Sequence, residues 1–377
     1  MHLFLLVHTS KKKLIFLSKN DLITNKSKNN LFKNISVGSE KEISLRKKYV
    51  ESKKTFFGEN KFIKTYRTNE KTKAEEITLK DLNGILDSGL RYLKENGIIQ
   101  EDLQKIENFG SLEGNSRLIS QKAKGKGLKQ IATLGSGNHY IEVQVIEEVF
   151  DNELAHKMGL KKDQIVYSIH TGSRGLGHQV KTEFDEILSY KSKEGEKYFL
   201  SMQSAANFAF ANRALICKKV KKVFYELFKN NCELIYDVSH NIITKEKIDN
   251  KEYLFHRKGA SRSFGKEICE HPIPVGGSMG TSSYLLLGTQ ESQLISLGGC
   301  CHGSGRIFSR KECLDNFTLE DLQNQMEGIH VRFGNERGLL EEIPSAYKNI
   351  EEVVLTCERN NIAKRIIKVK PLLVIKG

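Results

Sequence analysis

One histidine of this chain lies in a run of small residues that suits phosphate chemistry. His302 belongs to the segment Gly299-Cys300-Cys301-His302-Gly303-Ser304-Gly305-Arg306. The glycines at 303 and 305 lack the side chains that would keep a phosphate away from backbone N–H groups. An imidazole in such a loop can contact a phosphate, or act as a nucleophile that becomes phosphorylated or nucleotidylated. A histidine in an ordinary glycine-rich turn gives the same pattern, so the loop alone leaves both interpretations open.

Three further histidines stand beside small or polar residues at the ends of predicted strands. His139 follows Leu134-Gly135-Ser136-Gly137-Asn138, His170 opens a glycine-rich run, and His240 follows Tyr236-Asp237-Val238-Ser239. Metal sites are often built in this way, with one neutral imidazole from each of several loops. Each histidine taken alone is more typical of a hydrogen-bonded core residue than of a metal ligand. Together, the three indicate a candidate metal site.

Two other segments offer groups that bind phosphate. The loop Gly276–Ser283 combines flexible backbone with four hydroxyl groups, but it lacks the lysine of a P-loop, which excludes an ordinary P-loop NTPase. The segment His256–Arg262 contains three cations, Arg257, Lys258 and Arg262. Such cations suit the phosphate oxygens of RNA or a nucleotide. The alternative for this second segment is a surface turn with scattered charges.

Hydrophobic periodicity predicts the elements that must position these residues. A helix is predicted over Thr78–Asn96 and stopped by Gly97, and a long amphipathic helix over Ala205–Phe228, whose lysines 218, 219, 221 and 222 form a solvated face. The predicted strands are Tyr140–Val149, Ile165–Ile169, Glu233–Val238, Tyr253–His256, Ser283–Leu287 and Leu372–Ile375. The mixture predicts an α+β fold.

Charge and composition limit the class of protein. The net charge is +14, but residues 1–67 contain 16 Lys or Arg and 5 Asp or Glu, so the other 310 residues carry +3. A nucleic-acid surface must therefore come from local clusters rather than from the overall charge. The sequence contains no apolar run approaching the roughly 18 residues of a membrane span, and we expect no membrane partner. Seven scattered cysteines without a CxxC pair argue against a disulfide scaffold and favour a reducing compartment.

Nine motifs in one order resemble the RtcB family of RNA ligases. They reach from Gly135 to Gly377 and read GSGNHYIEVQ, HTGSRGLGHQV, AANFAFANR, YDVSHNI, HRKGASRSF, GSMGTSSY, CHGSGRIFSR, AYKN and LLVIKG. The resemblance implies one large α+β domain, with mixed sheets and helices around a deep metal and nucleotide cleft. It also implies joining of an RNA 3′-phosphate or 2′,3′-cyclic phosphate end to a 5′-hydroxyl end, with GTP and two Mn²⁺ ions as cofactors.

The resemblance also implies roles for individual residues. His302 would be the nucleophile that forms a histidine–GMP intermediate, and His139, His170 and His240 would hold manganese. The implied nucleotide contacts are Asn138, His139, Tyr140, Ile141, Glu142, His240, Asn241, Gly276, Gly277, Ser278, Met279, Ser283, His302, Gly303, Ser304, Gly305, Tyr347 and Lys376. The RNA would be tRNA exon halves, and an archease-like activator or subunits of a tRNA ligase complex would be partners. Reduced cysteines favour the cytoplasm or nucleus, with import into an organelle left open by the basic N-terminal part.

The N-terminal part departs from the family pattern. Residues 1–137 contain no Asp-x-x-Cys metal motif, and the first cysteine of the chain is Cys217. We expect residues 1–30 to be a disordered extension foreign to the family and residues 31–377 to form a ligase domain truncated at its N-terminus. We further expect the reading frame upstream, or a spliced transcript, to encode the missing motif. Two alternatives remain, a catalytically impaired RNA-binding or scaffold relative, and a metal-dependent phosphoesterase that uses the histidines for hydrolysis.

Overall fold

The chain is built around one large, mostly antiparallel sheet. The computed structural model describes residues 2–8, 77–184, 189–248, 250–263, 271–333 and 336–377. The strand order is β4-β1-β3-β2-β12-β9-β8, and β11 joins β12 in parallel beside this path. The strands of this sheet are β1 (His2–His8), β2 (Tyr140–Val149), β3 (Ile165–His170), β4 (Asn231–Val238), β8 (Ile273–Val275), β9 (Ser283–Gly288), β11 (His330–Arg332) and β12 (Ala363–Lys376).

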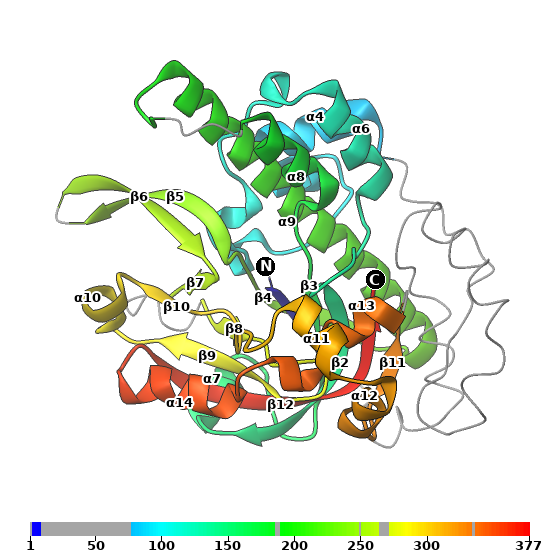
Figure 1. Cartoon of the computed structure of the whole chain (residues 1–377). Helices are drawn as coiled ribbons and strands as arrows, with labels where there is room; N and C mark the ends of the chain where they lie inside the picture. The colour runs from blue at the N-terminus through cyan, green and yellow to red at the C-terminus, as the bar shows by residue number, and fades with distance from the viewer. Residues whose placement is uncertain (1, 9–76, 185–188, 249, 264–270, 334–335) are drawn as a thin grey trace, which may run out of the picture.

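Helices and two small sheets complete the described fold (Figure 1). The helices are α4 (Leu79–Ser88), α5 (Leu90–Glu95), α6 (Gln121–Gln130), α7 (Asn152–Lys157), α8 (Arg174–Glu183), α9 (Lys193–Phe228), α10 (Ser292–Ser296), α11 (Arg310–Asn316), α12 (Leu319–Gln325), α13 (Glu336–Leu340) and α14 (Ile350–Arg359). Short 3-10 turns are η1 (Leu103–Lys105), η2 (Glu107–Gly110), η3 (Ser116–Leu118) and η4 (Pro344–Ala346). The small sheets pair β7 (Ala260–Arg262) with β10 (Gly299–Cys301), and β5 (Asn241–Ile248) with β6 (Lys251–Lys258). The described part of the chain therefore confirms the α+β class.

Both faces of the main sheet are buried. On β3, Tyr167 and Ile169 pack into one apolar cluster with side chains of α4, α6 and α9, whereas Val166 packs into a second cluster on the opposite face. This alternation follows from the two-residue period of a strand. Figure 1 shows α9, the longest helix, running across the sheet beneath α4, α6 and α8. The sheet is thus a rigid base for the loops at its edges.

The register of the central strands brings three polar residues into one row. Tyr140 at the start of β2 is opposite His170 at the end of β3 and opposite Lys376 at the end of β12. His240 follows the end of β4 by two residues. The polar residues that the sequence separates by more than two hundred positions therefore meet at one end of the sheet.

The predicted strands are confirmed, some with longer bounds. The predicted segment 372–375 is the end of β12, which begins at Ala363, and the segment 253–256 is the middle of β6. The predicted helix over residues 205–228 is confirmed as part of α9, which begins at Lys193. Two of its lysines, 218 and 222, are exposed, but Lys221 is partly buried and its Nζ lies 2.7 Å from Glu101 Oε2. The solvated lysine face is therefore smaller than predicted.

The single helix predicted over residues 78–96 is wrong. It is broken at Gly89 into α4 and α5. Gly89 has φ +58°, and a Cβ there would lie 2.2 Å from the carbonyl oxygen of Gly110. Only glycine fits this close approach between two backbone segments. Hydrophobic periodicity continues through the break, which is why the sequence pattern did not reveal it.

The prediction of a disordered N-terminal extension is wrong for residues 2–8. These residues form β1, which pairs antiparallel with both β3 and β4. Their register places His2 opposite His170. The rest of the predicted extension, and the region up to residue 76, lies outside the described residues. Within the described residues, no helix has the length and apolar character needed to cross a membrane.

Candidate active site

Four histidines from four different segments form a row at the end of the sheet. The ring centroids of His139 and His170 are 6.0 Å apart, and those of His170 and His240 are 5.2 Å apart. His240 stacks on His302 with a centroid separation of 4.1 Å and an angle of 24°. The structure thus brings together the four histidines that the sequence singled out.

A backbone contact defines the tautomer of the His302 ring. Its Nδ1 lies 2.7 Å from the carbonyl oxygen of Gly259. Because a carbonyl can only accept, Nδ1 carries the proton and the lone pair lies on Nε2. Burial lowers the pKa of His302, which favours this neutral form. Gly259 has φ +70°, and a Cβ there would lie 3.3 Å from His302 Cε1.

His170 and His240 meet through their Nε2 atoms. These two nitrogens are 3.1 Å apart, and both side chains are buried. Without a cation, one imidazole must donate a proton to the other. Two ligand nitrogens at about 2.0–2.1 Å from one divalent ion would lie about 2.8–3.4 Å apart for right-angle to tetrahedral geometry. The pair therefore fits two adjacent positions around one ion.

His139 is the outlying member of the predicted metal set. Burial, aided by the charge of Arg174, lowers its pKa to about 3, so its ring is neutral at pH 7 and can act as a ligand. Among the described residues, however, no choice of one ring nitrogen from each of His139, His170 and His240 puts the three atoms within 4.8 Å of one another. The predicted three-histidine metal site is thus a close pair with a third histidine one ring farther along the row.

Buried charges fix the ends of the strands that carry these histidines. Arg213 of α9 donates through Nε to both carboxylate oxygens of Asp237 on β4, at 2.7 and 3.0 Å, and neither side chain is exposed. Burial raises the pKa of Asp237 to about 6, and Arg213 opposes that shift. Glu107 Oε2 accepts from the backbone N–H of Ser239, next to His240, at 2.8 Å. These residues position His240 without contacting the cavity.

The glycine-rich loop after β8 is tied to the His302 loop. The N–H of Gly276 donates to His302 O at 3.1 Å, and the N–H of Ser304 donates to Gly276 O at 2.9 Å. Gly277 N–H donates to Ser283 Oγ, and Ser278 N–H to Thr281 Oγ1. These amides are therefore engaged within the chain, and the loop in this state is held closed rather than presenting all its amides to a phosphate.

Two opposite charges of the predicted nucleotide site lie buried at the end of the sheet. Burial raises the pKa of Glu142 to about 8, while Lys376 and Gln144 act in the opposite direction. Burial also lowers the pKa of Lys376 to about 8, against the attraction of Glu342 and Glu142. The Nζ of Lys376 lies 5.7 Å from the ring centroid of Tyr140. Lys376, one residue from the end of the sequence, is thus a fixed part of the site.

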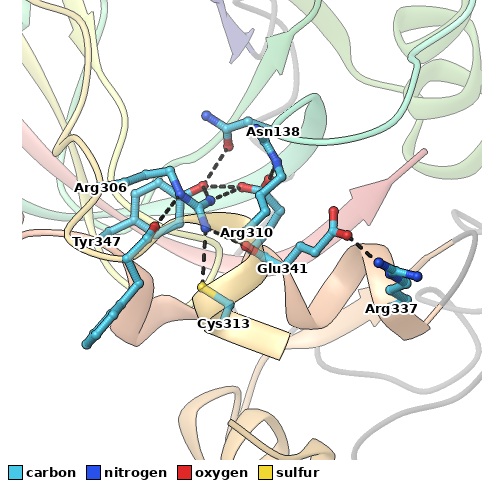
Figure 2. A network of polar contacts seen from close by, with 9 residues as sticks. Asn138, Arg306, Arg310, Cys313, Arg337, Glu341 and Tyr347 are labelled. Atoms are coloured by element: carbon cyan, nitrogen blue, oxygen red, sulfur yellow. Dashed lines mark hydrogen bonds and ion pairs between the residues drawn. The ribbon is translucent and has the colours of Figure 1, made fainter. Parts of the chain in front are cut away.

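A charged network forms the opposite wall of the site (Figure 2). Arg306 NH1 is 3.1 Å from both Glu342 Oε2 and the hydroxyl of Tyr347, and its NH2 donates to Glu341 O at 2.7 Å. The hydroxyl of Tyr347 also donates to Glu342 and lies 3.4 Å from Asn138 Oδ1. Burial raises the pKa of Tyr347, so this hydroxyl keeps its proton. Arg310 Nε pairs with the other oxygen of Glu342 at 3.0 Å.

A cavity of about 210 Å³ lies between the histidine row and this network. Tyr140 and His170 line it from the strands, and His302 from the loop after β10. The remaining lining residues are Asn138, Gly276, Gly277, Gly303, Ser304, Gly305, Arg306, Arg310 and Tyr347. The cavity thus brings together groups from five of the nine motifs.

Some predicted nucleotide contacts have their side chains elsewhere. Ile141 and Met279 are buried in two different apolar clusters, so only their backbone can face a ligand. Asn241 donates through Nδ2 to His240 Nδ1 at 3.1 Å and accepts from Gly259 N–H through Oδ1. Asn241 therefore orients the His240 ring and the turn that carries Gly259.

The predicted RNA-binding cations divide into two groups. Arg257 is buried and donates through NH2 to Glu246 Oε2 at 2.9 Å, and Arg262 NH2 lies 2.8 Å from Glu246 Oε1. Burial opposes ionisation of Glu246, but hydrogen bonds from these two arginines outweigh it and lower its pKa to about 2. The charges of both arginines are thus balanced by an acid that sequence reasoning did not include. Lys258 is exposed at the end of β6.

Sequence reasoning missed the charged residues that hold the site. Arg213 and Asp237 lie within motifs that were recognised, AANFAFANR and YDVSHNI, but neither received a role. A lone arginine among alanines and phenylalanines of a long helix is a usable signal, because a fully buried arginine requires a buried acid. Glu342 carries no such signal, since its segment is polar.

Comparison with known proteins identifies the family of this chain. A family model described as "tRNA-splicing ligase RtcB" matches residues 31–377. The chain belongs to the RtcB family. It is 39% identical over 346 residues to RNA-splicing ligase RtcB homolog 1 of Entamoeba histolytica, covering 81% of this chain and 66% of that protein. It is 37% identical to the tRNA-splicing ligases RtcB of Pyrococcus horikoshii and Methanococcus maripaludis, covering 78% and 80% of this chain.

The family relation is broader than the region of the nine motifs. The match begins at residue 31, ahead of the first described helix, and reaches the last residue. The chain spans about two thirds of the length of the Entamoeba relative, 39% of the Pyrococcus protein and 71% of the Methanococcus protein. The chain therefore covers only part of the length of each of these relatives.

Proposed function

We propose that this chain is an RNA ligase that joins RNA 3′-phosphate or 2′,3′-cyclic phosphate ends to 5′-hydroxyl ends, with GTP and Mn²⁺. The observation that carries the proposal is the state of His302. It is a neutral imidazole, oriented by Gly259 O, with its lone pair on Nε2 and its ring on the wall of a polar cavity. Relatives named as tRNA- or RNA-splicing ligases support RNA as the substrate.

The proposed chemistry proceeds in three displacements at phosphorus. Nε2 of His302 attacks the α-phosphorus of GTP, the N–P bond forms, and pyrophosphate leaves with the electrons of the broken P–O bond. An oxygen of the RNA 3′-phosphate then attacks the same phosphorus and restores the histidine. A 2′,3′-cyclic phosphate end would first be opened by water, which breaks the P–O2′ bond and leaves a 3′-phosphate and a 2′-hydroxyl. Finally the 5′-hydroxyl attacks the activated RNA phosphate and releases GMP. Fixed donors beside the cavity suit the charge that develops at each step.

The residues that would hold manganese are His170 and His240, with His139 next in the row. Their buried nitrogens and the 3.1 Å separation fit one ion. A divalent cation there would neutralise phosphate charge. Asn241 donates to His240 Nδ1 in this arrangement, so binding of manganese through Nε2 would require its amide to turn and accept a proton from Nδ1 instead.

Residues of the opposite wall and of the strand ends would bind the nucleotide. Tyr347, Asn138 and Lys376 offer a hydroxyl, an amide and an ammonium at fixed positions. Gly305, three residues after His302, borders open space, since a Cβ there would meet no atom within 4 Å. We include tRNA exon halves as the RNA, Lys258 as a phosphate contact, and an archease-like activator or tRNA ligase complex subunits as partners. The proposed location is the cytoplasm or nucleus.

The test is transfer of label from GTP to the protein. The reduced full-length chain is incubated with Mn²⁺ and GTP labelled at the α-phosphate. We expect covalent label on the wild type and none on His302→Ala. His156→Ala is a matched control, because His156 is exposed on α7 and lies in a different segment from the row, and it should keep the label.

Two outcomes would contradict the proposal. Binding of GTP without a covalent adduct supports the scaffold alternative. Cleavage of a 2′,3′-cyclic phosphate RNA that consumes no GTP supports the phosphoesterase alternative.

A further inference from the structure

Three cysteines that are far apart in the sequence meet beside the candidate active site. Cys300 and Cys301 are on β10, and Cys357 is in the last turn of α14. The sulfur of Cys357 lies 4.0 Å from that of Cys300 and 3.5 Å from that of Cys301. Among the described residues, these three are the set of His, Cys, Asp or Glu side chains whose ligand atoms all lie within 4.8 Å of one another.

The spacing fits three thiolates around one cation. With metal–sulfur bonds of about 2.3 Å, two ligand sulfurs are about 3.8 Å apart in tetrahedral geometry and about 4.0 Å apart in planar trigonal geometry. The two measured separations, 3.5 and 4.0 Å, bracket these values closely. Small rotations about the Cα–Cβ bonds would therefore close the set on an ion.

The surroundings select a soft cation. Cys300 and Cys357 are 3% and 7% exposed, within an apolar cluster that contains Ile273, Val354 and Ile350. Hard cations such as Mn²⁺ prefer oxygen ligands, whereas Zn²⁺ and its relatives prefer thiolates. Cys301 is partly exposed, so the set has one side open to solvent for entry and for a fourth ligand such as water.

We propose that Cys300, Cys301 and Cys357 bind one thiophilic divalent cation of the Zn²⁺ type. Binding releases the three thiol protons to solvent and forms three metal–sulfur bonds. The cation ties α14 to β10, and Cys301 directly precedes His302. The site is therefore a structural clamp behind the His302 loop, separate from the histidines proposed to hold manganese.

The test uses Cd²⁺, because thiolate ligands give Cd²⁺ a charge-transfer absorption that imidazole ligands do not. The reduced full-length protein is titrated with Cd²⁺ in the presence of a phosphine reductant. We expect one equivalent of Cd²⁺ to saturate the thiolate band. Cys357→Ser should weaken Cd²⁺ affinity by at least about tenfold. Loss of a residue that only hydrogen-bonds to a metal ligand already weakens metal binding by about that factor, and Cys357 would be a ligand itself.

Control variants separate this set from other thiols and from the histidine row. Cys232→Ser, Cys269→Ser and His240→Ala should keep the band, and Cys269 lies outside the described residues. A second measurement needs no variant, since Cd²⁺ should protect Cys301 of the wild type from alkylation by iodoacetamide. No thiolate band in the wild type, a band that Cys357→Ser leaves unchanged, or alkylation of Cys301 unaffected by Cd²⁺ would overturn the proposal.

Discussion

Two buried ion-pair systems hold the two sides of the cavity, and they are built differently. Behind the histidine row, Arg213 and Asp237 form a closed pair with no exposed surface. On the opposite wall, Glu342 is 1% exposed but is shared by Arg306, Tyr347 and Arg310, and the side chain of Arg310 is 52% exposed. The closed pair fixes strand ends, whereas the shared acid keeps donors at the cavity surface, where a ligand can compete for them.

The largest expected effect comes from breaking the closed pair. Asp237→Asn leaves the buried charge of Arg213 uncompensated, so we expect a loss of about 3–5 kcal/mol in the free energy of unfolding. Urea denaturation measures this loss. Asp315→Asn is the control, because Asp315 is exposed on α11, and it should change little. If both variants lose the same small amount of unfolding free energy, the pair of Arg213 and Asp237 does not hold β4 in place.

A smaller loss of stability is expected on the opposite wall, where Glu342 is shared by several partners. Glu342→Gln keeps the shape of the side chain and removes its charge, and Arg306 retains the carbonyls of Phe308 and Glu341 as hydrogen-bond partners. We therefore expect a loss of about 1.5–3 kcal/mol, the value of hydrogen bonds to a charged group. Glu341→Gln breaks a pair with Arg337 at the surface (Figure 2) and should cost about 0.5 kcal/mol or less. Equal losses from Glu341 and Glu342 would remove the distinction between the two acids.

The contact between Gly259 and His302 gives a sharper test of positioning. Gly259→Ala should cost about 1–2 kcal/mol, because φ is positive there. Gly97→Ala is a matched control, since Gly97 has φ +68° and no atom within 4 Å of a Cβ. Both variants should lose similar stability in urea, but only Gly259→Ala should slow labelling of His302 by GTP. Equal labelling rates would show that Gly259 does not position the ring.

The last effect concerns how stability changes with pH. His139 has a folded pKa of about 3, below its ordinary value near 6.5. The stability it contributes is complete above pH 6.5 and is lost as the pH falls toward 3, because the unfolded chain then binds one more proton. In the presence of a chelator, the free energy of unfolding of His139→Gln should fall less steeply between pH 6.5 and 4 than that of the wild type. The difference in slope should correspond to the uptake of up to one proton on unfolding. His256→Gln, at an exposed position, should leave the slope unchanged, and an unchanged slope in both would refute the buried state of His139.

The sequence predicted the residues of the site better than their partners. The histidines, Tyr140, Tyr347 and Lys376 follow from motifs and strand ends, and the structure brings them together. The break at Gly89 and the pairing of Arg257 with Glu246 do not follow, because both depend on contacts between segments that no local pattern records. The meeting of Cys300, Cys301 and Cys357 is of the same kind, since the spacing of these cysteines matches no metal motif.

Mapping the site of guanylylation tests the central claim most directly. The protein is incubated with GTP and Mn²⁺, digested under conditions that preserve an N–P bond, and sequenced by tandem mass spectrometry. The account predicts GMP on His302 within the peptide that follows Cys301. GMP on Lys376 or on another histidine, or the absence of GMP from a protein that nevertheless ligates RNA, would contradict it.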